Sequence, residues 1–382
     1  MTEPAAHTRS IRGLEGIIAN ESSICYVFGD EGRLIYRGYD IHDLAEHSTF
    51  EETAYLLLKG DLPSREQLQA FDEGLKTTRR LDPVVQRVIR DAPATANPMN
   101  VLRTAVSAAA FADPDSGDNS AGATWRKAVR LIAQLPTMVA AFHRRRNGQR
   151  PLAPRRGLGH AANVLYLLTG RVPDPEVARA LDVALILHAD HELNASTFAA
   201  RVIAATLADL HAAVTGALAA LAGPLHGGAN TEVMKMLLDI RTPERAEAWV
   251  RERLARREKI MGFGHRVYRT EDPRAAYLRR MSEQLGRKFG QSHWFAIQRI
   301  IEDVMKREKG LYCNVDFYSA SLYYVMGIPL DLFTPIFAVS RVSGWCAHVL
   351  EQHADNRLIR PRAEYLGPMN RQWVPVHRRV SG

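Results

Sequence analysis

The sequence predicts an all-α protein of many helices, with one small β-hairpin near its N-terminus. Two observations lead to this fold class. Most of the 382 residues fall into stretches whose apolar positions recur at helical spacing, and Gly, Pro or Asp/Ser clusters separate these stretches. A single pair of neighbouring runs is instead short, aromatic and β-branched. No fixed-period repeat indicates a solenoid.

The hairpin is predicted from the runs ICYVF (24–28) and RLIYR (33–37), which the residues GDEG separate. Aromatic and β-branched residues favour strands, and a four-residue connection that contains glycine is typical of a hairpin. We therefore expect two short antiparallel strands here.

The first helix is predicted in TFEETAYLLLKG, where Thr49 is a candidate N-cap, Glu52 follows three residues later and Gly60 ends the pattern. The segment LPSREQLQAFDEGLK repeats this logic with Ser64 and Gln67. The further predicted helical stretches are MNVLRTAVSAAAFA, TWRKAVRLIAQLPTMVAAFHRR, HAANVLYLLTG, DPEVARALDVALILHADHE, NASTFAARVIAATLADLHAAVTGALAALA, TEVMKMLLDI, PERAEAWVRERLARREKI and HWFAIQRIIEDVMKREKG.

Composition places the chain among ordinary soluble globular proteins, because 46% of its residues are hydrophobic and 24% are charged. Its length suggests about two or three domains. The N-terminal segment has no apolar stretch of the signal-peptide kind, and no window resembles a membrane span. The three cysteines, Cys25, Cys313 and Cys346, lack metal-type spacing. We therefore expect a protein of the reducing cytoplasm that has no membrane partner.

A net charge of +8 is compatible with nucleic acid, an anionic membrane surface or small polyanionic substrates as partners. The basic segment 143–156 contains Gly and Pro and is predicted to be a solvated loop, as is the polar segment 112–123. Neither interleaves aromatic residues in the manner of a single-strand binding surface. We expect no nucleic-acid partner.

The stretch GPLHGGAN (223–230) sets His226 among three glycines and a proline. A helix is predicted to begin near Asn230, a favoured N-cap, so His226 precedes a helix N-terminus. Free backbone N–H groups and the macrodipole disfavour a positive imidazole there, which predicts a neutral ring that donates a hydrogen bond. The alternative is a histidine that fills a turn.

The stretch IMGFGHRVYRTEDPRA (260–275) places His265 after Gly-x-Gly and follows it with three arginines, Arg266, Arg269 and Arg274. Glycines expose backbone polar groups, and guanidinium groups bind carboxylates and phosphates in bidentate geometry. This pattern indicates an anion site, although a run of charges can also be a solvated face.

Asp316 lies in YCNVDFYSASLYYVMGIP, among apolar and aromatic residues with no Lys or Arg nearby in sequence. A carboxylate in such surroundings has a raised pKa and is a better base. Asp316 is therefore a candidate general base, or else the cap of the helix that follows it.

His188 and His191 lie three residues apart in LHADHELNAST, at a predicted helix end. Two histidines at this spacing can bind a metal, which leaves a helical metallohydrolase as a rival interpretation. No second histidine motif of matching spacing supports it, so we expect no metal.

Taken in order, the segments HADHELNAST, GPLHGGAN, MGFGHRVYRTEDPRA, NVDFYSA, FTPIFAVSRVSGW and DNRLIRPRAEY resemble the motifs of the citrate synthase family. The N-terminal GRLIYRGYDIHDLAEHSTFEETAYLLLKGDLP resembles the bacterial members, so the resemblance spans nearly the whole chain. Several separated motifs in the right order are far more specific than any one of them.

The resemblance implies an almost entirely α-helical fold with a large domain, 1–227 and 328–382, and an inserted small domain, 228–327. The active site would lie in the cleft between them. No counterpart of the N-terminal segment of hexameric, NADH-regulated members precedes the hairpin, so a homodimer is expected.

By motif, His226 matches the histidine that donates a hydrogen bond to the thioester oxygen of acetyl-CoA. Asp316 matches the base that removes the methyl proton, and His265 matches the histidine that polarises the oxaloacetate carbonyl. A lone carboxylate cannot ionise a thioester α-carbon unless the developing oxyanion is stabilised at the same time. Asp316 and His226 must therefore act as a pair.

The remaining matches concern binding. The residues implied to bind oxaloacetate or citrate are His191, Arg274, Arg341 and Arg360. The partner subunit would receive Arg360, although Arg362 is an alternative for that role. The residues implied to contact coenzyme A are Arg269, at a phosphate, and Met261, Gly262, Phe263 and Gly264, whose backbone would face the adenine.

The implied reaction condenses acetyl-CoA, oxaloacetate and water into citrate and CoA through citryl-CoA, with no cofactor, as in the tricarboxylic acid cycle. A 2-methylcitrate synthase that uses propionyl-CoA shares these residues, because one methylene in an apolar pocket changes discrimination by only about 1–3 kcal/mol. A non-catalytic CoA-binding scaffold is disfavoured, because the His-His-Asp set is complete.

Overall fold

The computed structural model describes residues 12–14, 16–265 and 267–379. One compact unit spans Ser22–Leu358 and contains all the strands and α-helices described here. The flanking segments Met1–Glu21 and Ile359–Gly382 form a separate unit, whose described elements are the 3-10 turns Arg12–Leu14 and Val376–Arg378.

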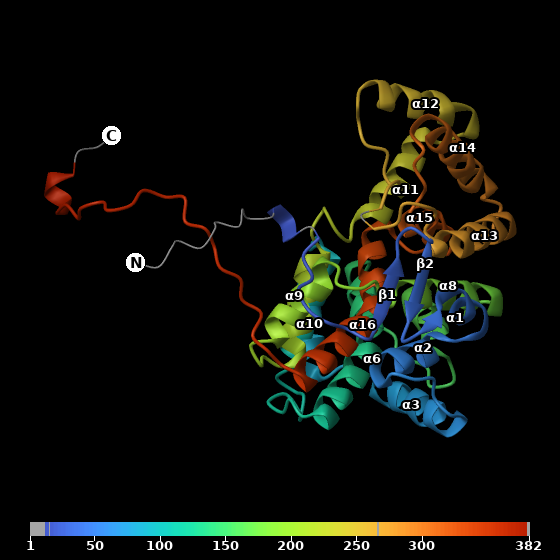
Figure 1. Ribbon diagram of the computed structural model, residues 1–382. Helices are drawn as coiled ribbons and strands as arrows, with labels where there is room; N and C mark the ends of the chain where they lie inside the picture. Colours follow the sequence, from blue (N-terminus) through green and yellow to red (C-terminus); the bar gives the residue numbers. More distant parts are fainter. Residues whose placement is uncertain (1–11, 15, 266, 380–382) are drawn as a thin grey trace. The chain divides into compact units, whose positions relative to one another are not determined.

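The predicted all-α fold is confirmed, and Figure 1 shows the helices of the compact unit with a small sheet among them. Sixteen α-helices lie in the described residues: α1 (Ile41–His47), α2 (Phe50–Lys59), α3 (Arg65–Thr78), α4 (Pro83–Asp91), α5 (Pro98–Ala109), α6 (Ala121–Arg146), α7 (His160–Thr169), α8 (Pro175–His188), α9 (Ala195–Ala204), α10 (Leu210–Leu221), α11 (Ala229–Ile240), α12 (Pro243–Ala255), α13 (Pro273–Lys288), α14 (Ser292–Lys309), α15 (Val315–Val325) and α16 (Phe333–Ala354).

The predicted hairpin is confirmed as β1 (Cys25–Phe28) and β2 (Arg33–Tyr36), paired antiparallel around the turn 29–32. A third strand, β3 (Tyr39–Asp40), pairs with β2 and was not predicted. Its two residues are too few to show a period in the sequence.

The predicted caps of α2 and α3 are confirmed. Thr49 accepts a hydrogen bond from the Glu52 amide, and Gly60 ends α2 in the left-handed region at φ 96°. Ser64 and Gln67 form a complete capping box at α3.

Three expectations need correction. The stretch predicted as one helix through residues 194–222 is broken into α9 and α10, with Leu207 between them at φ 64°. Asn230 does not cap α11, because the helix begins earlier, after Gly228, and Asn230 is buried within its first turn. The basic segment 143–156 is helical up to Arg146.

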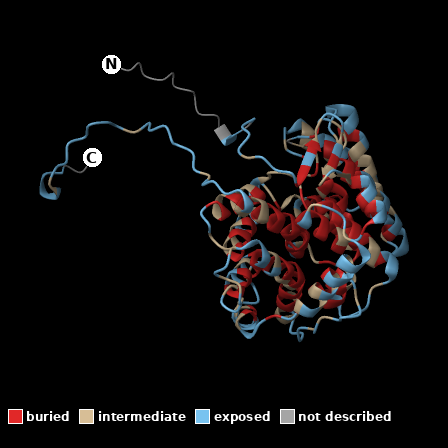
Figure 2. Ribbon diagram, turned by 60° about the horizontal axis from the view of Figure 1, so that its bottom comes forward, coloured by how far each residue is buried: buried red, intermediate tan, exposed pale blue. Residues whose placement is uncertain are grey.

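The core of the compact unit is built around α16, which is buried along almost its whole length and packs on α2, α6, α8, α9 and α10. Figure 2 shows this burial as the red interior helices. A second set of helices, α11 to α15, packs largely within itself, and Figure 1 shows it gathered beside β1 and β2. None of the described helices has the length and hydropathy of a membrane-spanning helix.

Candidate active site

His226 lies in the turn between α10 and α11, and its Nε2 atom faces the first turn of α9. Nε2 accepts a hydrogen bond from the Ser196 backbone N–H at 3.3 Å and lies 2.8 Å from the Ser196 hydroxyl. An atom that accepts from an amide cannot itself carry the proton, so the proton of the neutral ring lies on Nδ1. Trp345 fixes the arrangement, because its indole N–H donates to the Ser196 hydroxyl at 3.1 Å.

The ring of His226 is neutral, as the sequence predicted, but chiefly for another reason. Burial lowers the pKa of His226 to about 4, and the positive charge of Arg341 adds to the effect. The helix terminus that suggested neutrality in the sequence is therefore not needed for it.

His265 presents the opposite tautomer. Its Nδ1 atom accepts hydrogen bonds from the backbone N–H groups of Val267 and Tyr268, both at 3.0 Å, so the ring proton lies on Nε2. Burial, reinforced by Arg274, lowers the pKa of His265 to about 4. The segment after this histidine thus holds it as a neutral donor.

His191 lies against His265, with 5.1 Å between the ring centroids, and also contacts Tyr268. Burial, with Arg274 next in importance, lowers the pKa of His191 well below its usual value. Its Nε2 atom is buried and has no hydrogen-bond partner among the described residues. Such a group is available to a ligand.

Two buried guanidinium groups face this region from α13 and α16. Arg274 makes a bidentate ion pair with Asp272, at 2.9 Å from Nε and 2.7 Å from Nη2. Arg341 donates from Nε to the His188 carbonyl at 2.7 Å, and neither of its other nitrogens has a partner among the described residues. A buried, incompletely paired guanidinium is suited to an anionic ligand.

Asp316 lies in the first turn of α15. The cap of this helix is Asn314, whose Oδ1 accepts a hydrogen bond from the Asp316 amide at 3.1 Å. The capping alternative for Asp316 is therefore wrong. Burial raises the pKa of Asp316 to about 6, although Arg274 and Arg341 oppose the increase. No described residue donates a hydrogen bond to the Asp316 carboxylate, so the carboxylate is free to accept a proton from a bound substrate.

The glycine loop 260–264 is fastened to the start of α15. Gly264 donates to the Tyr312 carbonyl at 3.1 Å, and the Gly262 carbonyl accepts from the Asn314 amide at 2.9 Å. Gly262 has φ 84°, and a Cβ atom there would overlap the Phe317 ring. Met261 and Phe263 complete this loop and are partly buried. The backbone polar groups of Phe263 lie between these two bonds.

Of the other predicted anion-binding residues, Arg269 lies at the surface of the compact unit. Arg269 is exposed and forms an ion pair with Asp30 of the hairpin turn at 3.1 Å, while its amide donates to the Gly29 carbonyl. Arg266 lies outside the described residues. Arg360 and Arg362 belong to the separate unit, where both are exposed.

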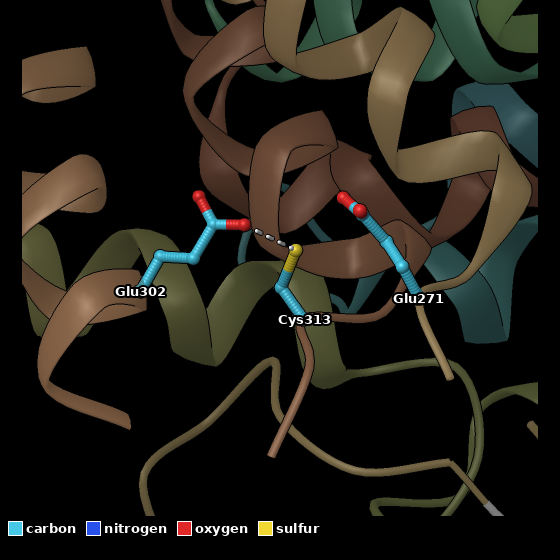
Figure 3. A group of neighbouring side chains, drawn as sticks. All are labelled: Glu271, Glu302 and Cys313. Carbon is cyan, nitrogen blue, oxygen red and sulfur yellow. Dashed lines mark hydrogen bonds between the residues drawn. The ribbon is translucent and has the colours of Figure 1, made fainter. Parts of the chain in front are cut away.

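The metal alternative gains no support from the described part of the chain. The group with metal-ligand spacing there is Glu271, Glu302 and Cys313, drawn in Figure 3, and it contains neither histidine of the 188–191 pair. Arg279 already bonds both carboxylates, and the Cys313 thiol donates to Glu302. Burial raises the pKa of Cys313, which disfavours the thiolate that a metal requires. This cluster is an ion-pair network.

A cavity of about 450 Å³ lies away from this site, on α2, α3 and α6, where Tyr55, Phe71 and Trp125 line it. None of the residues discussed above belongs to it. Its rim cations Arg126 and Arg130 are paired with Asp113 and Asp115, and we assign it no role.

Sequence reasoning missed three residues that organise the site: Ser196, Trp345 and Asp272. Each lies inside a motif singled out above, yet none has a chemistry that marks it alone. Only the Asp-Pro sequence at 272–273, typical of a helix start, gave a usable signal, and Asp272 does cap α13.

Two neutral imidazoles in fixed tautomers, a carboxylate with a raised pKa and two buried guanidinium groups define an acid–base site for an anionic substrate within an all-α enzyme fold. The family model "Citrate synthase, C-terminal domain" matches residues 13–362. The chain therefore belongs to the citrate synthase family.

Individual relatives agree. The chain is 49% identical over 370 residues to citrate synthase 2 of Bacillus subtilis, covering 97% of this chain and 99% of that protein. It is 43% identical over 369 residues to 2-methylcitrate synthase of Mycobacterium tuberculosis, covering 96% and 93%.

Solved structures agree as well. Citrate synthase from Pyrobaculum aerophilum matches with a TM-score of 0.92 at 44% identity, covering 97% of this chain and 95% of that one. The ternary complex of carboxymethyl coenzyme A and oxaloacetate with citrate synthase from Thermoplasma acidophilum matches with a TM-score of 0.91 at 34% identity, covering 96% of this chain and 98% of that one.

Proposed function

We propose that this chain is a citrate synthase that condenses acetyl-CoA with oxaloacetate and water, giving citrate and CoA. In class it is an acyltransferase that converts the acyl group into an alkyl group on transfer, of the citrate (Si)-synthase type. The observation that carries the proposal is the combination of a half-buried carboxylate of raised pKa, Asp316, with two neutral histidines whose protonated nitrogens differ.

The first step is enolisation. The Asp316 carboxylate removes a proton from the acetyl methyl group, while Nδ1–H of His226 donates to the thioester oxygen as negative charge develops there. Because the pKa of its imidazolium form is lowered, His226 is already neutral at this stage, and its remaining N–H stabilises the enol or enolate by a hydrogen bond. Neither group suffices alone, because the methyl protons of a thioester are very weakly acidic.

Condensation and hydrolysis follow. The enol carbon attacks the keto carbon of oxaloacetate, and Nε2–H of His265 donates to the oxygen that becomes the hydroxyl of citryl-CoA. Arg274 and Arg341 bind carboxylates of oxaloacetate, and Nε2 of His191 donates or accepts a further hydrogen bond, so that one face of the ketone is presented. Water then cleaves the thioester and releases citrate and CoA.

Coenzyme A would be bound by the outer part of the site. Arg269 is the proposed phosphate contact, and Met261, Gly262, Phe263 and Gly264 are proposed to lie along the adenine. The exposure of Arg269 and the open space around Gly264 support access for a ligand here. The related structure from Thermoplasma acidophilum, which contains a coenzyme A analogue together with oxaloacetate, supports the same pair of substrates.

The assembly and location are proposed as follows. The chain forms a homodimer in which Arg360 enters the site of the partner, with a large domain of 1–227 and 328–382 and a small domain of 228–327. The self-packed set α11 to α15 supports this division. We propose no cofactor, metal, nucleic-acid or membrane partner, and a cytoplasmic location, which the three unpaired cysteines support.

A 2-methylcitrate synthase is the second candidate, favoured by the relative of that name at 43% identity. Release of free CoA in the presence of oxaloacetate separates the candidates when acetyl-CoA and propionyl-CoA are compared. A higher kcat/KM with acetyl-CoA supports the first proposal, and a higher value with propionyl-CoA supports the second. Absence of CoA release with both would overturn the proposed enzyme.

A further inference from the structure

Asp272 connects two parts of the site that are distant in sequence. Its Oδ1 atom accepts from the Arg274 backbone N–H at 3.1 Å and from Nε at 2.9 Å. Its Oδ2 atom accepts from Nη2 of Arg274 at 2.7 Å and from the Val315 backbone N–H at 3.1 Å. Val315 is the first residue of α15 and directly precedes the candidate base.

The carboxylate of Asp272 is 1% exposed, and each of its oxygens accepts two hydrogen bonds from this small set of donors. Its charge is retained in the interior: burial alone would raise the pKa of Asp272, but the charge and hydrogen bonds of Arg274 outweigh burial and hold that pKa below its usual value. A helix cap needs only one of these four bonds. Of the other three bonds, two bind the Arg274 side chain and one binds the Val315 amide, so the carboxylate joins the arginine to α15.

We propose that Asp272 is a positioning residue that couples the substrate-binding guanidinium of Arg274 to the helix that carries the base, Asp316. When oxaloacetate binds Arg274, the shared carboxylate holds the first turn of α15 in the same arrangement, so the base is set when the second substrate arrives. This inference rests on the proposed function, because it assigns oxaloacetate to Arg274.

The charge of Asp272 also sets the strength of the base. The charged and titratable groups that face Asp316 are Arg274 from α13, Arg341 from α16, Tyr323 from α15 and Asp272 itself. The two arginines favour the Asp316 carboxylate and Asp272 disfavours it. Removal of the Asp272 charge therefore leaves Arg274 uncompensated and lowers the pKa of the base.

The first test measures the coupling without turnover. In the whole protein, hydrogen exchange of the amides from 312 to 319 is followed with and without oxaloacetate, in the wild type, in Asp272→Asn and in Asp82→Asn. Asn remains a good N-cap, so α13 keeps its cap, and Asp82 caps α4 through a single bond to the Val84 amide, which makes it the matched control. We expect oxaloacetate to slow exchange in the wild type and the control but not in Asp272→Asn.

The second test uses the pH profile. In Asp272→Asn we expect kcat to fall at least about 10-fold, because Arg274 and the first turn of α15 lose the carboxylate that holds them together, and we expect the acidic limb of the profile to move to lower pH. A merely structural role would lower activity and leave the limb in place. Asp272→Ser, a smaller cap residue, is expected to show the same shift if the Asn variant does not fold.

The outcomes are distinct. Equal oxaloacetate-induced protection in the wild type and in Asp272→Asn overturns the coupling, as does a fall in kcat with an unmoved acidic limb. If the wild type releases no CoA from acetyl-CoA, the proposed function fails. Protection that oxaloacetate induces in the wild type and that is lost in the variant would in that case still support the coupling.

Discussion

The Nε2 atom of His226 accepts a hydrogen bond from the backbone N–H of Ser196, which lies thirty residues earlier in the chain. This relationship determines which nitrogen of His226 carries the proton, because a backbone amide can only donate. It also explains why the side chain is held by α9 while the residue itself belongs to the turn before α11.

Ser196→Ala tests the hydroxyl part of this arrangement. The variant keeps the amide bond to His226 but removes the hydroxyl at 2.8 Å and leaves the Trp345 indole N–H without its acceptor. We expect kcat to fall about 10-fold and the free energy of unfolding to fall by about 1–3 kcal/mol. Steady-state kinetics and chemical denaturation measure both.

Ser343→Ala is the control, because among the described residues its buried hydroxyl bonds only the Ser340 carbonyl, within α16. It should lower stability less and leave kcat unchanged. Equal kinetic losses in the two variants would contradict the role given to Ser196.

The pH dependence of kcat/KM follows from the three groups that we propose to be catalytic, Asp316, His226 and His265. The base must be deprotonated to act, and burial raises the pKa of Asp316 to about 6, so the rate should rise as pH increases through that value. His226 and His265, each with a pKa of about 4, stay neutral throughout the range and add no limb of their own. A profile that is flat from about pH 5 to about pH 7 would contradict the assignment.

Ionisation of Asp316 should raise the rate but lower the free energy of unfolding. The folded-state pKa of Asp316 is raised above the unfolded value, so ionisation destabilises the folded protein increasingly as pH rises from about 4 to about 6. Asp316→Asn should therefore gain stability over the wild type at pH 7 and gain least near pH 4. Unfolding curves at both pH values measure the difference, and a gain that does not depend on pH would contradict the buried-charge explanation.

The hairpin turn supports the segment that follows His265. A Cβ atom at Gly29 would overlap the Val267 carbonyl oxygen, and Val267 supplies one of the two amides that fix His265. We expect Gly29→Ala to lower kcat at least about 10-fold, since a backbone shift of this size misplaces the donor. Gly117→Ala, which has open space around its Cβ, is the control and should be neutral. Unaltered kinetics of Gly29→Ala would show that the turn is dispensable.

Arg269 and Asp30 should affect coenzyme A binding in opposite directions. Both side chains are exposed and pair with each other, so Asp30 competes with any phosphate for Arg269. Arg269→Ala should raise the KM for acetyl-CoA, whereas Asp30→Asn should lower it, and the effect of each should shrink at high salt. A lower KM in Arg269→Ala would exclude the phosphate contact.

Local signals in the sequence were sufficient for part of the fold. The caps at Thr49 and Ser64 and the hairpin around 29–32 depend on neighbours within a few residues, and all were predicted. Four helices, α1, α4, α13 and α16, were not assigned. For α16 the reason is physical: it is buried on nearly every face, so its apolar residues show no helical period.

The site divides in the same way. His226, His265 and Asp316 stand out because their residue types are unusual in their neighbourhoods. Their partners Ser196 and Asp272 act through hydrogen bonds between segments far apart in the chain, and no local pattern records those bonds. The sequence predicts a neutral His226 and a raised pKa for Asp316, but the tautomer of each histidine is visible only in the folded structure, which places the hydrogen-bond donors around each ring.

The most direct test of the proposed mechanism is Asp316→Ala, with Asp303→Ala on the exposed face of α14 as the control. CoA release from acetyl-CoA and oxaloacetate is measured alongside calorimetric binding of oxaloacetate. Removal of the base should reduce CoA release at least about 100-fold and leave the oxaloacetate dissociation constant nearly unchanged. Near-normal CoA release in Asp316→Ala, or a loss of oxaloacetate affinity that accounts for the defect, would contradict the assignment of Asp316 as the base.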